Sequence, residues 1–134
     1  MKVLSSMVAD LIHEGHLNLL ERASGYGDLI VCVPTSEGAY RAKGKRPIID
    51  FEGRLRMVNA LKCVSMTIGF VDNEHLDRII EFIKPDVFIR GDDWQDFPGR
   101  KKLEDMGIKI ILLPYTKSIS STLIKERCLK DLEN

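Results

Sequence analysis

Short apolar runs alternate along this chain with stretches in which apolar residues recur at helical spacing. Continuous runs rich in valine, isoleucine and leucine are typical of strands that are buried on both faces of a parallel sheet. The runs predict five strands, at residues 2–8, 28–33, 64–71, 86–89 and 108–113.

The stretches between the runs predict helices. The clearest covers residues 74–84, where Leu76, Ile79, Ile80 and Ile83 fall on one face. The others are predicted at residues 16–24, 51–62 and 100–106, with a last helix that begins near Ser120 and ends at about residue 132. Residues 35–50 carry several basic side chains and predict a polar loop.

Five alternations of strand and helix predict one α/β domain spanning residues 1–134. We expect a Rossmann-like three-layer sandwich with a five-stranded parallel sheet, because parallel strands need helical crossovers on both faces. Right-handed crossovers with one reversal give the strand order 3-2-1-4-5. A ligand would then bind at the carboxyl ends of the first and fourth strands.

Composition narrows the classes of function. The chain has 20 basic and 20 acidic residues, so a general attraction to nucleic acid or to an anionic membrane is not expected. Its three cysteines show no metal-binding spacing, which argues against a disulfide framework or a zinc site. Without a signal-like segment or a long apolar run, we expect a cytoplasmic protein with no membrane partner.

The stretch His13-Glu14-Gly15-His16 follows the first predicted strand and opens a helix. Such a turn directs backbone N–H groups and the positive end of the helix dipole towards one point, where an anion can bind. Gly15 permits close approach of the backbone, and the two imidazoles supply further donors. The alternative is that one histidine caps the helix and the other is solvated.

Two more polar motifs follow strands at the same predicted edge. Gly91-Asp92-Asp93-Trp94 comes after the fourth strand, and Ser120-Ser121-Thr122 comes after the fifth. Carboxylates suit ribose hydroxyls, a base amino group or a metal, and hydroxyls at a helix N-terminus suit phosphate. Each motif also has a purely structural interpretation, as a capped turn, a helix cap or, for Trp94, a core side chain.

Together these residues resemble the cytidylyltransferase family of the HxGH nucleotidyltransferase superfamily, most closely the glycerol-3-phosphate cytidylyltransferase type. Residues 10–16 are similar to its D-x-x-H-x-G-H motif, and Arg54, after Phe51-Glu52, is similar to the arginine of its E-x-R motif. Residues 91–94 match G-D-D-W and residues 119–124 are similar to I-S-T-T-x-I. The resemblance extends from about residue 2 to residue 126.

The resemblance implies transfer of CMP from CTP to a small phosphorylated alcohol, of the glycerol 3-phosphate type, or to a phosphonate. Pyrophosphate leaves as an acceptor oxygen attacks the α-phosphate in line, and this oxygen is already ionised, so no strong general base is required. Mg²⁺ would come with the triphosphate, since the chain offers no dedicated metal site. The resemblance also implies a homodimer.

The resemblance also assigns roles to individual residues. The implied catalytic residues are His13, His16, Lys43, Arg54, Ser121 and Thr122. Those implied to bind the nucleotide or its metal are Asp10, Gly15, Lys45, Gly91, Asp92, Asp93, Trp94 and Ser120. A solvated loop for the lysines, and an ordinary surface position for Arg54, are the structural alternatives.

The chain departs from the family pattern at two places. Met7-Val8-Ala9 stands where the family has G-T-F, and Tyr115 stands where an arginine begins the R-T-x-x-I-S-T motif, with Lys117 the nearest cation. These departures leave the base and the acceptor open. The alternatives are an ATP-dependent adenylyltransferase acting on a sugar 1-phosphate of the heptose type, and a nucleotide-binding module without catalysis.

Overall fold

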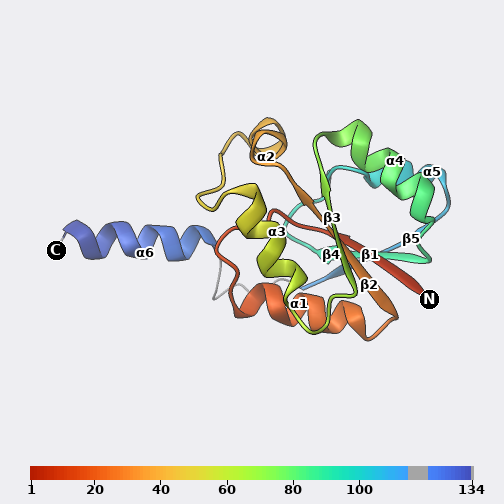
Figure 1. Cartoon of the computed structure of the whole chain (residues 1–134), viewed down its shortest axis with the longest axis horizontal. Helices are drawn as coiled ribbons and strands as arrows, with labels where there is room; N and C mark the ends of the chain where they lie inside the picture. The colour runs from red at the N-terminus through yellow and green to blue at the C-terminus, as the bar shows by residue number, and fades with distance from the viewer. Residues whose placement is uncertain (115–120, 134) are drawn as a thin grey trace.

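The computed structural model describes residues 1–114 and 121–133, and its centre is a five-stranded, entirely parallel sheet with helices on both faces (Figure 1). The strand order is β3-β2-β1-β4-β5, which confirms the predicted Rossmann-like topology. The order reverses between β1 and β4, so the loops after these two strands open at the switch point of the sheet.

The strands follow the predicted apolar runs, with ends that differ by one to two residues from the prediction. They are β1 (Lys2–Ser6), β2 (Asp28–Pro34), β3 (Met66–Phe70), β4 (Val87–Gly91) and β5 (Lys109–Leu113). β1 pairs with β2 along its whole length and with β4 at Val3 and Leu4. Because β1 and β4 pair only at Val3 and Leu4, the carboxyl ends of these two strands are not paired with each other.

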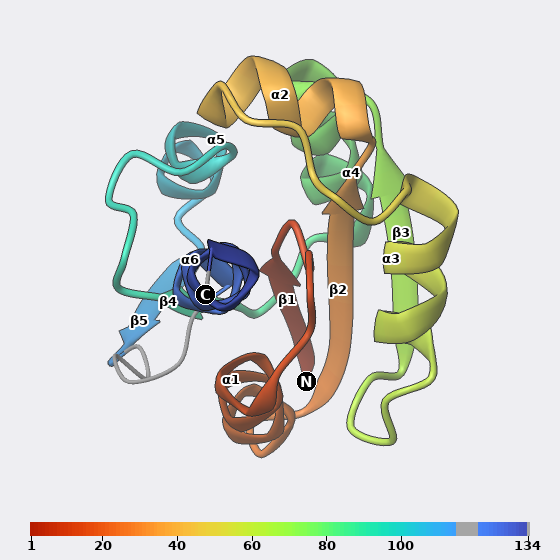
Figure 2. The same cartoon turned by 90° about the vertical axis from the view of Figure 1, so that its left-hand side faces the viewer.

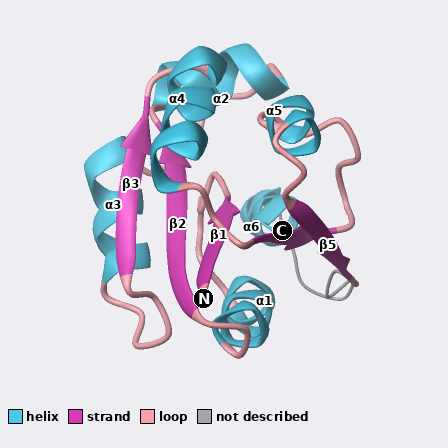
Figure 3. Cartoon of the chain, turned by 90° about the vertical axis from the view of Figure 1, so that its right-hand side faces the viewer, coloured by secondary structure: helices cyan, strands magenta, loops and turns pink. Residues whose placement is uncertain are grey.

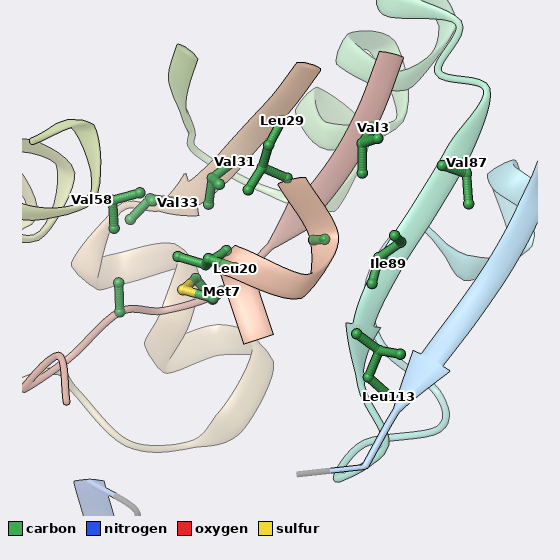
Figure 4. Close-up of a cluster of buried hydrophobic side chains, with 12 residues drawn as sticks. Val3, Met7, Leu20, Leu29, Val31, Val33, Val58, Val87, Ile89 and Leu113 are labelled. Atoms are coloured by element: carbon green, nitrogen blue, oxygen red, sulfur yellow. The ribbon is translucent and has the colours of Figure 1, made fainter. Parts of the chain in front are cut away.

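Each face of the sheet has its own apolar core. On one face α1 (Glu14–Ser24) and α3 (Phe51–Asn59) cover the strands, and Figure 4 shows Leu20 of α1 and Val58 of α3 among valines and leucines of β1 and β2. On the other face lie α4 (Asn73–Ile83) and α5 (Arg100–Asp105) (Figure 3). Successive strand residues therefore enter opposite cores, as the period of a strand requires.

The prediction of a loop over residues 35–50 is wrong in its first half, because α2 (Ser36–Lys43) is a helix. Thr35 caps its N-terminus by accepting a hydrogen bond from the Gly38 N–H at 3.1 Å, and Gly44 ends it in the left-handed conformation. These end signals stabilise a helix whose interior shows only a weak apolar stripe. The basic residues at its end are thereby fixed at the carboxyl edge of the sheet.

The last element is α6 (Ser121–Glu133), which projects from the body of the molecule in Figure 1 and is seen nearly end-on in Figure 2. Within the described ranges, no helix has the length and apolar character needed to cross a bilayer. The start of α6 is held against the sheet edge by Lys125, which bonds to Asp10.

Candidate active site

A cavity of about 400 Å³ opens at the carboxyl ends of β1 and β4, the place where the strand order predicts a ligand. Its wall combines the loop after β1, the first turn of α1, the end of α2 with the following loop, the end of β4, and α6. The ionisable side chains in the lining are Asp10, His16, Lys43, Lys45, Arg46, Arg90, Asp93 and Lys125. Five of these are lysine or arginine and two are carboxylates, so the cavity suits an anion.

The two histidines form a reciprocal cap at the start of α1. His13 Nδ1 accepts a hydrogen bond from the Gly15 N–H at 3.0 Å, and His16 Nδ1 accepts one from the His13 N–H at 3.2 Å. A ring nitrogen that accepts a hydrogen bond carries no proton, so the neutral ring carries its proton on Nε2. The alternative is therefore correct in that a histidine caps the helix, but wrong in that the other is solvated, because both rings take part in the cap.

Burial keeps these two rings neutral. It lowers the pKa of His16 to about 4, with a further lowering from His13 that Asp93 and Asp10 only partly oppose. Burial also lowers the pKa of His13, and the His13 Nε2 atom is buried with no hydrogen-bond partner among the described residues. The rings lie 4.1 Å apart between centroids, and of the two only His16 lines the cavity, with His13 directly behind it.

Asp10 joins three segments around the cavity. Its carboxylate accepts hydrogen bonds from the Ile48 and Ile49 N–H groups at 2.9 and 3.0 Å, and from Lys125 Nζ at 2.9 Å. Burial raises the pKa of Asp10, but the hydrogen bonds from Lys125 and the two N–H groups outweigh this, so the pKa lies below its ordinary value. Asp10 thus holds the loop after α2 and the helix α6 in place.

Arg54 is fully buried and lies outside the cavity lining. Its guanidinium donates to the carbonyl oxygens of Ile49, Val8 and Pro34, each at 2.9 Å, and to Ser36 Oγ at 3.1 Å. The ordinary surface position considered for it is wrong. Its role as a phosphate ligand stays a prediction. The hydrogen bonds indicate that Arg54 instead holds in place the loops that form the cavity wall.

Arg90, at the end of β4, lines the cavity and was missed by the motif analysis. It is 8% exposed and donates through one nitrogen to the Ser6 carbonyl at 3.0 Å and to Ser6 Oγ at 3.1 Å. Its guanidinium lies 5.3 Å from the centroid of the Trp94 ring, and Lys43 Nζ lies 5.0 Å from the same centroid. One signal in the sequence could have identified Arg90: it is a basic residue in a buried strand, at a position whose side chain faces the core.

Trp94 is a core side chain, as its structural alternative proposed, and its role in nucleotide binding stays a prediction. It packs against the core beneath α4 and α5, and it also carries Lys43 and Arg90 on its ring. It lines a recess of about 30 Å³ beside the main cavity rather than the cavity itself. That volume holds little more than one water molecule, so we assign Trp94 to support of the two cations.

The other predicted residues separate into two groups. Lys45, Gly91 and Asp93 line the cavity, whereas Gly15 and Asp92 do not. Gly15 is buried in the cap of α1, and Asp92 is exposed, with its N–H bonded to the Leu113 carbonyl. Ser120 lies outside the described residues, and so do the side chains of Ser121 and Thr122, whose backbone begins α6.

The loop that replaces the family's G-T-F segment forms part of the wall. Ala9 adopts φ 60° and Leu11 adopts φ 52°, a left-handed backbone that side chains other than glycine rarely take. Met7 turns into the core beside Leu20 (Figure 4), and Ala9 is 2% exposed. Packing on both sides thus maintains a strained loop next to the ligand cavity, as is common at functional sites.

The chain matches the family model described as cytidylyltransferase-like over residues 8–127. It is 35% identical over 136 aligned residues to the bifunctional protein HldE of Desulfatibacillum aliphaticivorans, with 98% of this chain and 27% of the relative covered. It is 37% identical to the bifunctional protein HldE of Streptomyces coelicolor, with 88% and 26% covered. The chain therefore spans about a quarter of the length of these relatives.

A solved structure with the same fold is that of the lipopolysaccharide core biosynthesis protein from Thermoplasma volcanium. The TM-score is 0.71 at 28% sequence identity, and the match covers 87% of this chain and 96% of the other. The similarity therefore extends over most of this chain.

Proposed function

Because the chain belongs to the cytidylyltransferase-like family and is a nucleotidyltransferase-like domain, we propose that it transfers AMP from ATP to a sugar 1-phosphate of the heptose type, releasing pyrophosphate. The similarity to the HldE proteins supports this reaction more than it supports CTP-dependent transfer. The similarity to a lipopolysaccharide core biosynthesis protein supports a sugar as acceptor, since such a core is an oligosaccharide built from activated sugars.

The observation that carries the proposal is the pair of neutral N–H donors at the start of α1. His13 and His16 are oriented by their Nδ1 atoms; His16 lines the cavity, whereas the His13 Nε2 atom is buried without a hydrogen-bond partner among the described residues. In the proposed reaction these donors bind triphosphate oxygens whose charge grows as the bond to pyrophosphate breaks. Donors fixed in advance by the helix cap need no reorganisation when that charge develops.

The proposed step requires no general base. An oxygen of the acceptor phosphate attacks the α-phosphorus, the bond from this phosphorus to the bridging oxygen breaks, and its electron pair leaves with pyrophosphate. The acceptor oxygen is already ionised near neutral pH, so no proton is transferred. The residues of this chain therefore contribute by positioning the two phosphates and by stabilising charge.

Mg²⁺ is expected to accompany the triphosphate and to neutralise part of its charge. Among the residues that the structure describes, no group of three or more histidine, cysteine or carboxylate side chains is arranged to hold a metal ion. Asp93 lines the cavity, whereas the carboxylate of Asp10 is engaged by Ile48, Ile49 and Lys125. We assign contact with the nucleotide-bound Mg²⁺ to Asp93.

CTP-dependent transfer to glycerol 3-phosphate is the second candidate. Residues 91–94 spell the G-D-D-W motif on which that resemblance rests, and Gly91 and Asp93 line the cavity. The side chains that would contact a base and those that would contact phosphate are shared by both candidates. The nucleotide must therefore be identified by experiment.

The test is pyrophosphate release with each of ATP, CTP, GTP and UTP, against heptose 1-phosphate, glucose 1-phosphate and glycerol 3-phosphate, in the presence of Mg²⁺. We expect release with ATP and a sugar 1-phosphate, and its loss in His16→Ala. His75→Ala is the matched control, because His75 lies on α4 outside the cavity lining. Release only with CTP and glycerol 3-phosphate would transfer the assignment to the second candidate.

A further inference from the structure

Arg90 is a buried cation without an ion pair in the part of the chain that the structure describes. One of its nitrogens bonds to Ser6, but its Nε atom is buried and has no hydrogen-bond partner among the described residues. Burying a charge with unsatisfied donors is costly unless an opposite charge compensates. Asp93 reduces this cost electrostatically, but it forms no ion pair with Arg90 in the described part of the chain, so we expect an anion from outside the chain to complete the compensation.

A second cation lies beside it. Lys43 and Arg90 both line the main cavity and both lie over the Trp94 ring, at 5.0 and 5.3 Å from its centroid. Burial lowers the pKa of Lys43, and the charge of Arg90 lowers it further, whereas Asp93 opposes this lowering without cancelling it, so each cation still makes the other more costly. An arrangement that holds two repelling cations together fits a doubly charged anion, such as a phosphate monoester.

This pair lies on the opposite side of the sheet from the histidines. Arg90 packs over Phe97, which belongs to the core beneath α4 and α5, whereas His13 and His16 begin α1, whose Leu20 belongs to the other core. The cavity therefore crosses the sheet edge, with Lys43 and Arg90 on one side and His16 on the other. In-line transfer needs the attacking and leaving phosphates on opposite sides of the α-phosphorus.

We infer that Arg90 and Lys43 bind the phosphate group of the acceptor, while the histidine side of the cavity holds the triphosphate. This inference rests on the proposed transfer to a phosphorylated acceptor. Arg90 holds the acceptor phosphate through the donors that Ser6 leaves unused, and Lys43 supplies the second positive charge. The acceptor oxygen is thereby directed at the α-phosphorus from the side opposite pyrophosphate, and the phosphoanhydride bond forms as the bond to pyrophosphate breaks.

The first experiment separates the acceptor from the nucleotide in steady-state kinetics. Arg90→Met removes the charge at similar length, and we expect the acceptor KM to rise by about 10- to 100-fold, the value of a charge-assisted hydrogen bond, with the nucleotide KM unchanged. Arg90→Lys keeps the charge, and its acceptor KM should lie between those of the wild type and of Arg90→Met. Arg100→Met is the matched control, because Arg100 also lies over Phe97, at 5.7 Å, but does not line the cavity.

The second experiment does not depend on turnover. Trp94 is the only tryptophan, so its fluorescence reports the Lys43–Arg90 pair directly. Titration with heptose 1-phosphate, glucose 1-phosphate or glycerol 3-phosphate should change this fluorescence in the wild-type protein and in Arg100→Met. The unphosphorylated sugars should have no effect, and Arg90→Met should lose the response.

The outcomes distinguish this inference from the proposed function. Pyrophosphate release with an acceptor KM that Arg90→Met leaves unchanged would overturn the inference and keep the function. A phosphate-dependent Trp94 response that Arg90→Met abolishes, without pyrophosphate release from any pair of substrates, would keep the subsite and overturn the function. A weaker nucleotide Kd in Arg90→Met, with the acceptor response intact, would assign Arg90 to the triphosphate instead.

Discussion

The charged side chains in the cavity wall and directly behind it fall into two parts, which differ in the partners that the protein provides for them. Around Asp10 and Arg54 the protein supplies partners itself, since three donors bind the carboxylate and four acceptors surround the guanidinium. His16, Lys43 and Arg90 line the cavity, and the buried Arg90 Nε atom has no hydrogen-bond partner among the described residues. We call the first part the closed framework (Asp10, Arg54 and Lys125) and the second the open wall (His16, Lys43 and Arg90). The comparison teaches that a buried charge marks a ligand site only where the protein leaves it incompletely bonded.

The largest expected effect is loss of stability on breaking the closed framework at Arg54. Arg54→Met removes the donor from three carbonyl groups, of which that of Pro34 is buried and those of Val8 and Ile49 are partly buried, and we expect the free energy of unfolding to fall by about 3 to 5 kcal/mol. Urea unfolding measures this change. The control is Arg56→Met on the exposed face of α3, which should change stability little, and an equally small effect of Arg54→Met would mean that Arg54 is not structural.

The next largest effect falls on catalysis at the open wall. His16→Ala removes one N–H donor, and we expect kcat for pyrophosphate release to fall by about 10²- to 10³-fold, as for other preorganised donors to a developing anion. Stability should change far less than in Arg54→Met. Full activity in His16→Ala, in a protein with unchanged thermal unfolding, would contradict a catalytic role for this ring.

The closed framework and the open wall should contribute to stability over different ranges of pH. The pKa of His16 is about 4 in the folded protein and about 6.5 in an unfolded chain, so the unfolded state binds more protons between these values. Stability from His16 is therefore complete above pH 6.5 and is lost as the pH falls towards 4, by up to about 3 kcal/mol. The pKa of Asp10 is also lowered in the folded protein. Its contribution to stability is therefore present at pH values above the ordinary pKa of an aspartate, and is lost as the pH falls through the lowered pKa.

Urea unfolding of the wild type and of His16→Ala between pH 4 and 8 tests this difference. The wild type should lose stability between pH 6.5 and 4, and His16→Ala should lose clearly less. The pyrophosphate release rate should show no inflection near pH 6.5 from His16, since this ring stays neutral there. Equal slopes in the two proteins would show that His16 is not a buried neutral group.

The smallest effect is expected at the edge of the closed framework. Lys125→Met removes the ion pair to Asp10 and leaves the backbone N–H groups of Ile48 and Ile49 in place, so we expect a loss of about 1 kcal/mol, typical of a partly exposed ion pair. The pKa of Asp10 should rise in this variant, which NMR titration measures. Lys130→Met, on the exposed part of α6, is the control and should leave both quantities unchanged.

The sequence carried enough information for the sheet but not for every helix. Apolar runs gave all five strands and their order, because burial on both faces requires continuous apolar residues and right-handed crossovers restrict the topology. The helix α2 was missed, since its support comes from Thr35 and Gly44 at its ends and only weakly from an apolar stripe. Local end signals decide such short helices, and a search for periodicity overlooks them.

For the candidate site, too, some features could be predicted from the sequence and others could not. The sequence by itself determined the carboxyl edge of β1 and β4, the histidine pair and Asp93, because these follow from motif positions after strands. The cavity residues Lys43 and Lys45 followed from the family resemblance. Only the tertiary structure decided that Arg54 is enclosed by carbonyl groups whereas Arg90 faces the cavity. Both are arginines in regular elements, and the difference between them lies in which distant backbone groups the fold brings within hydrogen-bonding distance.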